Sequence, residues 1–466
     1  MTFPMSARLG ALMAAGVLSA CSSLAPTYNR PDAPVSTTWP HDAATEGAIA
    51  TADIEWQSFF PDPRLRELIA LALQGNRDLR LSVLAIEQAR AQYQIRRADE
   101  LPTVGAQLNA ARAPGAGGHL VNTFSAGLAL SAWEIDFFGR IRSLSDAALA
   151  QYLATEQGRQ AAQISLVAAV ANAWLSLVAD EDLLGLTRQT LSTRQESLRL
   201  ARLRFANGVT SELDFRQAES LTESARVTLA QQQRQRALDE NALVLLIGQP
   251  LPATFAASAG IDAVTLADVP AGAPSDLLVR RPDIRQSEQQ LIAANANIGA
   301  ARAAFFPRIA LTAAVGSASS ELTGLFKSGS LGFTLAPSLL LPIFDAGRNR
   351  AGLQSATVGR DIALVQYERS IQTAFREVAD ALAGRATLVD QLQAQRAVAA
   401  AESARLRLSD LRYANGVASY LDLLDAQRSL FAAQQALVQT RLAQLQSQVA
   451  LYKALGGGWT DAAPGR

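Results

Sequence analysis

The amino-acid sequence predicts a mainly α-helical chain with a small proportion of membrane-type β-strand. Three observations predict it: long proline-free stretches rich in helix-forming residues, four short segments of alternating polarity, and a repetition of one half of the chain in the other. Helices of the expected length are abnormal for a compact enzyme and favour a coiled-coil or helical-barrel architecture.

Two proline-free stretches allow helices of unusual length. No proline occurs between Pro114 and Pro250, or between Pro342 and Pro464, and both stretches are rich in Ala, Leu, Gln, Arg and Glu. Proline inside a helix costs about 3 kcal/mol, so its absence permits long helices. The segments 139–207 and 347–415 could each be nearly continuous and approach about 100 Å at about 1.5 Å per residue.

Four segments alternate between apolar and small or polar residues, as half-buried strands do. Their apolar positions begin at Val104, Phe124, Ile309 and Leu331, and each run covers about 10 residues, the length of a tilted barrel strand in a membrane. The same pattern is compatible with a soluble β-sandwich. Because four strands cannot close a pore, a membrane barrel would need several chains.

The two halves of the chain repeat each other at an offset of 412 − 204 = 208 residues. Eight of eleven residues are identical between segments 204–214 and 412–422, and the same offset pairs Gly139 with Gly347. Each half therefore reads as a helix, two strands, a long helix, an Asn-Gly turn and a second long helix. Since Asn and Gly tolerate a left-handed backbone, each Asn-Gly predicts a tight reversal between two helices.

Eight prolines, from Pro250 to Pro342, lie between the two proline-free stretches. Residues 250–282 read as a loop-rich connector. Pro282 followed by Asp283 predicts the end of one helix and the start of the next, with Gln286 at the spacing of a capping box.

The N-terminus reads as a secretory signal over residues 1–20, with a short apolar stretch after Arg8. The sequence that ends at Cys21 resembles a bacterial lipoprotein box, in which the cysteine is acylated, and Ser22 resembles the pattern sorted to the outer membrane. An ordinary signal peptide with a chance cysteine is the alternative. Acyl chains contribute about 0.8 kcal/mol per buried methylene, enough for stable anchoring.

Composition excludes several classes of protein. The chain has 466 residues with 42 basic and 42 acidic side chains, so it lacks the positive charge of a nucleic-acid-binding protein. Its one cysteine allows no intrachain disulfide and no cysteine metal cluster, and its two histidines, His41 and His119, are isolated. We therefore expect no enzymatic activity, no cofactor, no metal site and no nucleic-acid partner.

Five further segments carry a resemblance to a known family. They are 133–140 (WEIDFFGR), 280–284 (RRPDI), 300–307 (AARAAFFP), 342–347 (PIFDAG) and 421–428 (LDLLDAQR). With them, essentially the whole mature chain resembles the TolC-like outer-membrane efflux factors, closest to the lipoprotein NodT/OprM branch. The resemblance implies a homotrimer in which four strands per chain form a 12-stranded outer-membrane barrel. Beneath it, long coiled-coil helices would form a periplasmic α-barrel, surrounded by an equatorial belt.

The resemblance also assigns regions along the chain. They are a signal peptide (1–20), a lipid-anchored segment with equatorial contacts (21–60), α-barrel and equatorial helices (61–100), barrel strands one and two (101–134), long periplasmic helices with a tip near 207–211 (139–249), an equatorial connector (250–282), a helix (283–305), barrel strands three and four (306–342), long helices with a tip near 415–419 (347–455) and a C-terminal tail (456–466).

The two tips are expected to contact a periplasmic adaptor protein, as in the family. The residues that match the tip pattern are Asn207, Gly208, Val209, Ser211, Asn415, Gly416, Val417 and Ser419. The alternative is that they only form the turns.

The resemblance places Leu421 and Asp425 at a periplasmic constriction facing the axis, with Arg428 nearby as a latch. Subtracting 208 pairs Asp425 with Gln217 and Arg428 with Ser220, so this acidic and basic pair occurs once per chain. Threefold symmetry would bring three carboxylates together, and three Leu421 side chains would form an apolar ring. The alternative is a solvated Asp–Arg pair, worth less than about 1 kcal/mol.

The expected function is the outer-membrane exit duct of a tripartite, proton-driven multidrug efflux system in a Gram-negative bacterium. The duct would conduct drugs or other small toxic compounds passively from the periplasm to the exterior. Its partners would be outer-membrane lipid, a periplasmic adaptor (membrane fusion) protein and an inner-membrane RND-type transporter. Two alternatives stay open: the exit duct of a type I secretion or metal-efflux system, and a lipid-anchored periplasmic coiled-coil scaffold without a pore.

Overall fold

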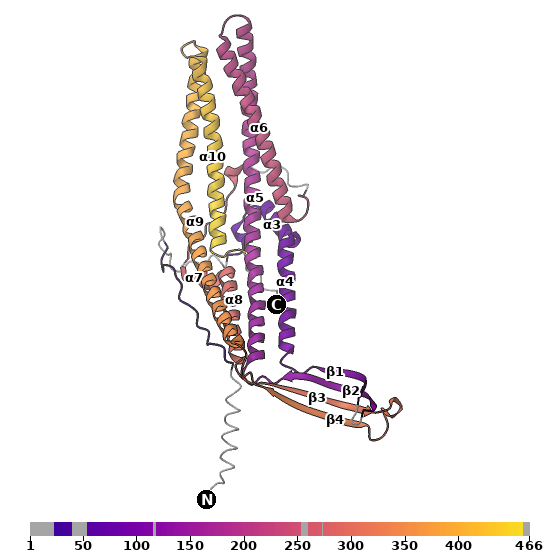
Figure 1. Cartoon of the computed structure of the whole chain (residues 1–466). Coiled ribbons are helices and arrows are strands. Elements are labelled where there is room, and N and C mark those ends of the chain that lie inside the picture. The colour runs from indigo at the N-terminus through magenta and orange to yellow at the C-terminus, as the bar shows by residue number, and fades with distance from the viewer. Residues whose placement is uncertain (1–22, 40–53, 115–117, 253–259, 273, 460–466) are drawn as a thin grey trace. The chain divides into compact units, whose positions relative to one another are not determined.

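The computed structural model describes residues 23–39, 54–114, 118–252, 260–272 and 274–459 (Figure 1). The signal segment 1–20 and Cys21 lie outside the described residues. The chain divides into two compact units. The first comprises Met1–Ala33, Leu84–Gln157 and Gln286–Arg369, and the second comprises Pro34–Val83, Gly158–Arg285 and Ser370–Arg466.

The first unit contains one antiparallel sheet of four strands in the order β1-β2-β3-β4. The strands are β1 (Val104–Pro114), β2 (Leu120–Glu134), β3 (Arg308–Ser319) and β4 (Leu331–Leu340). They lie where the sequence alternates, and the pairing of β1, β2 and β3 extends beyond the alternating runs.

The register gathers the apolar positions of all four strands on one face. Leu128 of β2 lies between Ala106 of β1 and Val315 of β3, and Val315 pairs with Phe333 of β4. The opposite face carries the row Gln107, Gly127, Gly316 and Gly332 at the next position. Because side chains alternate with a period of two, a slip of one residue in any pair would exchange these faces.

A bulge in β2 keeps Trp133 on the apolar face. The β2–β3 register shifts between Leu130 and Trp133, and Ala132 takes a left-handed backbone with φ of 43°. Thr312 Oγ1 accepts a hydrogen bond from the Ala132 amide at 3.3 Å. The bulge adds one residue to β2, which advances by three residues while β3 advances by two, so the parity of the strand changes and Trp133 pairs with Leu311.

Each hairpin of the sheet continues into a long helix through an aspartate. Asp136 accepts hydrogen bonds from the amides of Arg140 and Arg142 at 2.7 and 2.8 Å, and Asp345 accepts from Gly347 and Asn349 at 2.9 and 2.8 Å. These carboxylates satisfy amides that the first turn of a helix leaves free and favour the positive end of the helix dipole. Two of the recognised family segments therefore form strand-to-helix joints.

The N-terminal segment that begins at Ser23 lies along α8 (Pro282–Ala303). Arg302 and Asn295 donate to the carbonyls of Leu24 and Pro26, and Arg30 forms a two-pronged ion pair with Glu288 at 2.7 Å for both bonds. The contacts move toward the start of α8 as the segment advances, so the segment runs antiparallel to the helix.

The long helices reproduce the internal repeat residue by residue. Helices α5 (Arg140–Ala206) and α9 (Arg348–Ala414) each have 67 residues, and they are followed by α6 (Glu212–Ile247) and α10 (Tyr420–Ala454). The starts of α5 and α9 differ by 348 − 140 = 208 residues, and those of α6 and α10 by 420 − 212 = 208. Figure 1 shows each pair folded back as a helical hairpin.

The second unit has an apolar core where its helices meet the short helices α2 (Trp56–Phe59) and α3 (Pro63–Gly75). Tyr452 of α10 stacks on Phe59 with ring centroids 4.0 Å apart, and both side chains are fully buried. Helix α5 contains an 18-residue window with mean hydropathy of 1.7, and 61% of that window is buried inside the protein. We read this window as part of the core.

Helix α4 (Arg77–Ala98) precedes the sheet, and the connector contains the one-turn helix η3 (Ile261–Ala263) and α7 (Pro274–Arg280). The expected capping box at Asp283 is wrong. Helix α8 begins at Pro282, so Asp283 lies in its first turn rather than at the N-cap. Its carboxylate accepts two hydrogen bonds from the buried Arg281, at 2.9 and 2.6 Å.

Candidate functional site

The candidate site is the end of the second unit where both helical hairpins turn. In the first turn Gly208 has φ of 68°, its amide donates to Phe205 O at 2.9 Å, and the Val209 amide donates to Arg204 O at 2.8 Å. This pair of bonds is the Schellman motif, in which a left-handed residue satisfies the last carbonyls of a helix. The second turn repeats it at Gly416, with φ of 71°.

The polar tip residues are used by the turns themselves. Asn207 and Asn415 each donate a side-chain hydrogen bond at 2.7 Å to a carbonyl four residues earlier. Ser211 and Ser419 are the N-caps of α6 and α10, and Ser419 with Asp422 forms a capping box. The exposed apolar side chains at the tips are Val209 (73% exposed) and Val417 (67%).

Asp425 is held between two arginines. Its carboxylate accepts a hydrogen bond from Arg428, one turn later on α10, and another at 2.5 Å from Arg405 of the facing helix α9. Arg405 also donates to Glu402 and Ser429, at 3.2 and 3.3 Å. The structure thus brings Asp425 and Arg428 together as the sequence indicated, and it adds an arginine that sequence reasoning missed.

Arg405 could have been found from the symmetry of a helical hairpin. The two arms run antiparallel, so residues equally distant from the turn lie opposite one another. Counting from Val417, Arg405 is 417 − 405 = 12 residues before the turn and Ser429 is 429 − 417 = 12 residues after it. Asp425 lies one helical turn from Ser429, within reach of the same guanidinium.

The charges of this cluster compensate one another. The Arg405 guanidinium, with Arg428, holds the pKa of Asp425 below its usual range. The Asp425 carboxylate is therefore neutralised by side chains of its own chain. Leu421, one turn toward the tip, is 56% exposed and makes no part of the chain's own core.

A second set of contacts joins the two hairpins near their tips. Arg204 of α5 donates a hydrogen bond to the Tyr413 hydroxyl of α9, and its guanidinium carbon lies 5.4 Å from the centre of that ring. Tyr413 in turn packs against Tyr420, with ring centroids 5.4 Å apart. Burial raises the pKa of the Tyr420 hydroxyl to about 12, so it stays neutral at physiological pH.

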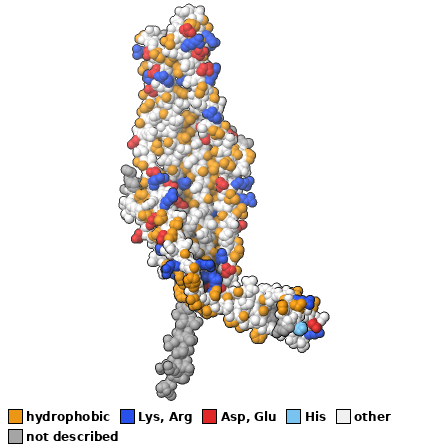
Figure 2. Space-filling view, viewed as in Figure 1, with side chains coloured by type: hydrophobic (Ala, Val, Ile, Leu, Met, Phe, Trp, Pro, Cys, Tyr) orange, Lys and Arg blue, Asp and Glu red, His pale blue; other side chains and the backbone are white. Residues whose placement is uncertain are grey.

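Charged side chains of both signs gather at this end of the second unit (Figure 2). Most form pairs three or four residues apart on one helix, for example Arg216 with Glu212 and Glu219. Within the described residues, no group of three or more His, Cys, Asp or Glu side chains is arranged to hold a metal ion.

Known proteins share this architecture over the whole chain. The antibiotic efflux pump outer membrane protein ArpC and the toluene efflux pump outer membrane protein TtgC, both from Pseudomonas putida, are 48% identical over 465 residues, covering 97% of this chain and 96% of each relative. The open state of the MtrE outer membrane channel of Neisseria gonorrhoeae superimposes with a TM-score of 0.87 at 41% identity, covering 94% of this chain and 99% of that one.

These similarities confirm the predicted TolC-like fold class and the outer membrane of a Gram-negative bacterium as the location, and they identify an efflux channel. The model of the family described as "Outer membrane efflux protein" matches residues 68–249 and 273–457, one match for each half of the internal repeat. The chain therefore belongs to the outer membrane efflux protein family.

Proposed function

We propose that the protein is the exit duct of a tripartite, proton-driven multidrug efflux system. It assembles as a homotrimer and passively conducts drugs or other small toxic compounds from the periplasm to the exterior. The observation that carries this proposal is the four-stranded sheet, whose two edges are unpaired within the chain and whose faces differ in polarity.

The free edges of the sheet need partner strands, which further copies of the chain would supply. Strands β1 and β4 each pair on one side, and every residue of both is exposed. An open edge cannot lie in a bilayer, because each unpaired backbone group there costs several kcal/mol. Three chains with four strands each supply 4 × 3 = 12 strands, an even number that closes a bacterial outer-membrane barrel.

The two faces of the sheet suit a duct. The face with Leu128, Val315 and Phe333 matches the apolar band that a barrel turns toward lipid. The opposite face carries Gln107, Thr334 and several glycines, which leave space and hydrogen-bonding groups for water. A channel that releases diverse solutes needs such a wettable lining.

A lipid anchor at Cys21 agrees with the contacts of the next residues. Ser23 lies two residues after Cys21, and its Oγ is 3.2 Å from Ser143 Oγ near the start of α5. A side chain at Gly139 would collide with Ser23, since a Cβ there would lie 2.8 Å from the Ser23 Cα. Gly139 follows the end of β2 by 139 − 134 = 5 residues, so acyl chains on Cys21 would be tethered close to the ends of the membrane strands.

The gate we propose combines Leu421 with the cluster of Asp425, Arg428 and Arg405. Three exposed Leu421 side chains around the axis would form an apolar ring that resists wetting. The cluster ties α10 to α9 and fixes the second hairpin as one body, and the Arg204–Tyr413 contact ties that hairpin to the first. Opening would require the second hairpin to move relative to the first and to break that contact.

The tips are the proposed contact with the periplasmic adaptor. Since Asn207, Gly208 and Ser211 are engaged by their own turn, and Asn415, Gly416 and Ser419 by theirs, these residues would set the shape of the contact. The exposed Val209 and Val417 would supply its apolar surface. We propose drugs as the transported compounds and an inner-membrane RND-type transporter as the partner by analogy with the relatives, which are named as antibiotic and toluene efflux pump components.

Single-channel conductance in a planar bilayer tests the duct and its gate. We expect a low conductance for the detergent-purified wild type and a higher one for Leu421→Ser and Asp425→Ala. The matched control is Leu213→Ser, because Leu213 is the counterpart of Leu421 in the first hairpin (421 − 208 = 213) and is also exposed. No conductance from any folded variant would contradict the duct and favour the scaffold. An equal rise for both leucine variants would contradict the position of the gate.

A further inference from the structure

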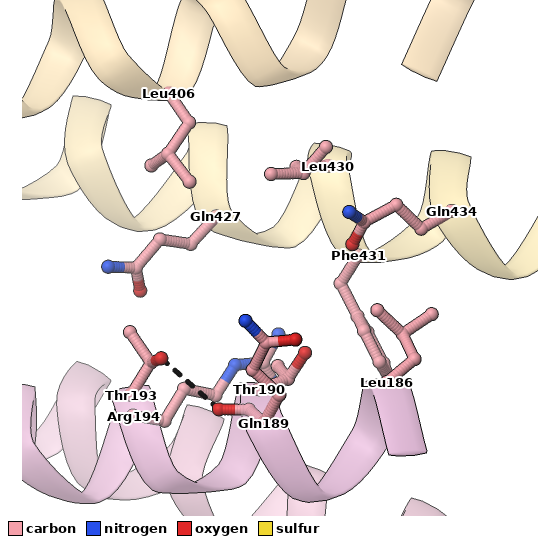
Figure 3. Close-up of a pocket in the computed structure, with 10 residues that line it drawn as sticks. All are labelled: Leu186, Gln189, Thr190, Thr193, Arg194, Leu406, Gln427, Leu430, Phe431 and Gln434. Carbon is pink, nitrogen blue, oxygen red and sulfur yellow. Dashed lines mark hydrogen bonds between the residues drawn. The ribbon is translucent and has the colours of Figure 1, made fainter. Parts of the chain in front are cut away.

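A cavity of about 160 Å³ lies in the second unit, between the two helical hairpins, and its lining includes Leu406 and Gln427, the sequence neighbours of Arg405 and Arg428. Figure 3 shows its walls. Residues of α5, including Thr190 and Arg194, form one side. Residues of α10, including Gln427 and Phe431, form the other together with Leu406 of α9. An occupant of this cavity would contact both hairpins at once.

The lining is amphipathic. Its apolar part consists of Leu186, Leu406, Leu430 and Phe431, and its polar part consists of three glutamines, two threonines and one arginine. Apolar walls with a few convergent polar groups are typical of sites for small organic molecules. A strongly hydrated inorganic ion would gain little from four large apolar side chains.

Arg194 is the unusual member of this lining. The residue is only 5% exposed, and it forms no ion pair with an acidic side chain in the described part of the chain. One guanidinium nitrogen donates to Leu221 O at 3.0 Å, and the guanidinium carbon lies 5.3 Å from the centre of the Phe431 ring. Its Nε, however, is buried and has no hydrogen-bond partner among the residues that the structure describes.

An arginine is almost never fully buried without a counter-ion, because removing its charge from water is costly. The positive charge is also specific to the first hairpin. The internal repeat pairs residue 194 with residue 194 + 208 = 402, which is a glutamate. Gln427 Oε1, across the cavity, is also buried and accepts no hydrogen bond from the described part of the chain. The cavity therefore offers an uncompensated positive charge and free polar groups beside apolar walls.

We propose that this cavity binds a small aromatic carboxylate, whose carboxylate pairs with Arg194 and whose ring packs against Leu406 and Leu430. The volume agrees, since an engineered protein cavity of about 150 Å³ accommodates benzene. A guanidinium is the side chain best suited to a carboxylate, because its parallel N–H groups match the two oxygens. On the proposed function of the protein as a gated duct, such a ligand would hold the two hairpins in their resting arrangement.

Binding of 4-fluorobenzoate to the detergent-solubilised full-length protein, followed by ¹⁹F NMR with detergent alone as blank, tests the proposal. We expect saturable binding that benzoate displaces and that sodium sulfate does not. The neutral 4-fluorobenzamide, which has the same shape, should bind much more weakly. Arg194→Met should weaken binding about tenfold or more, as loss of a charge-assisted hydrogen bond does. The control Arg188→Met, at an exposed arginine of the same helix, should not.

A second variant distinguishes loss of the binding site from a folding defect caused by replacing Arg194. Leu406→Trp fills the cavity from α9 and leaves the arginine in place, so it should also abolish binding. Absence of saturable binding to the wild type, equal binding of the amide, or full binding to either cavity variant would overturn the proposal. Displacement by sulfate would overturn the aromatic class. Because binding is measured without current through a pore, it can succeed or fail independently of the proposed duct.

Discussion

We expect Asp180 to make the stability of the second unit depend on pH. Its side chain, on α5, is buried at 7% exposure, its Oδ2 has no hydrogen-bond partner among the described residues, and the neighbouring carboxylate that acts on it is Asp239 of α6. Burial, and then Asp239, raise the pKa of Asp180 to about 7, whereas Arg236 lowers it and Glu181 adds to the increase. Two carboxyl groups in one such site are best accommodated when one of them carries a proton.

The direction of the pH dependence follows from this raised pKa. Between the unfolded pKa of 3.8 and the folded pKa of about 7, the folded chain binds more protons at Asp180 than the unfolded chain does. The stabilisation that this protonated site gives to the folded state is therefore fully present below about pH 4 and is lost as the pH rises through about 7. Asp180→Asn removes the ionisation and keeps the shape of the side chain.

We expect Asp180→Asn to stabilise the protein above pH 7 and to have little effect near pH 4. Each unit of pKa shift corresponds to about 1.4 kcal/mol, and part of the cost relaxes through water and Arg236, so the gain is on the order of 2 kcal/mol per chain at pH 8. Thermal unfolding of the purified protein in detergent, followed by circular dichroism from pH 4.5 to 8.5, measures it as a change in midpoint temperature.

The control for this experiment is Asp390→Asn, at an exposed carboxylate of α9. This variant should follow the pH profile of the wild type. If Asp180→Asn also followed that profile, or if it destabilised the protein at pH 8, the carboxyl pair would not govern the pH dependence.

Three further predictions concern stability. Gly127→Ala should lower the free energy of unfolding by about 1 to 3 kcal/mol, because its Cβ would lie 2.3 Å from a backbone oxygen of β3. The control Gly332→Ala has open space around its Cβ and should leave the stability unchanged. Equal melting temperatures for the two variants would contradict this prediction. Arg281→Met leaves the carboxylates of Glu377 and Asp283 without their ion-pair partner and should lower the free energy of unfolding by about 3 kcal/mol, measured by thermal melting. A loss below about 1 kcal/mol would show that water replaces the buried guanidinium. Ser419→Ala removes an N-cap worth about 1 kcal/mol, and hydrogen exchange should accelerate in the first turn of α10 only.

The positions of the long helices could be predicted closely from the sequence. Proline acts locally, and so do the Asn-Gly turn signals, so their spacing located the reversals at Gly208 and Gly416 without tertiary information. Period-two alternation located the four strands for the same reason. The capping assignment at Asp283 failed because the helix already begins at Pro282, and the Asp283 carboxylate pairs with the guanidinium of Arg281, which the packing of the second unit buries.

The composition, the internal repeat and the family segments by themselves determined that this chain is a duplicated, largely helical outer-membrane efflux protein. Only the tertiary structure decided which side chains meet across its helices. Arg405 reaches Asp425 from the other arm of a hairpin, and Arg194 is buried between two hairpins with no acidic partner among the described residues. The physical reason is that helix and turn preferences act over a few residues, whereas contacts between helices depend on rotation and register that packing fixes.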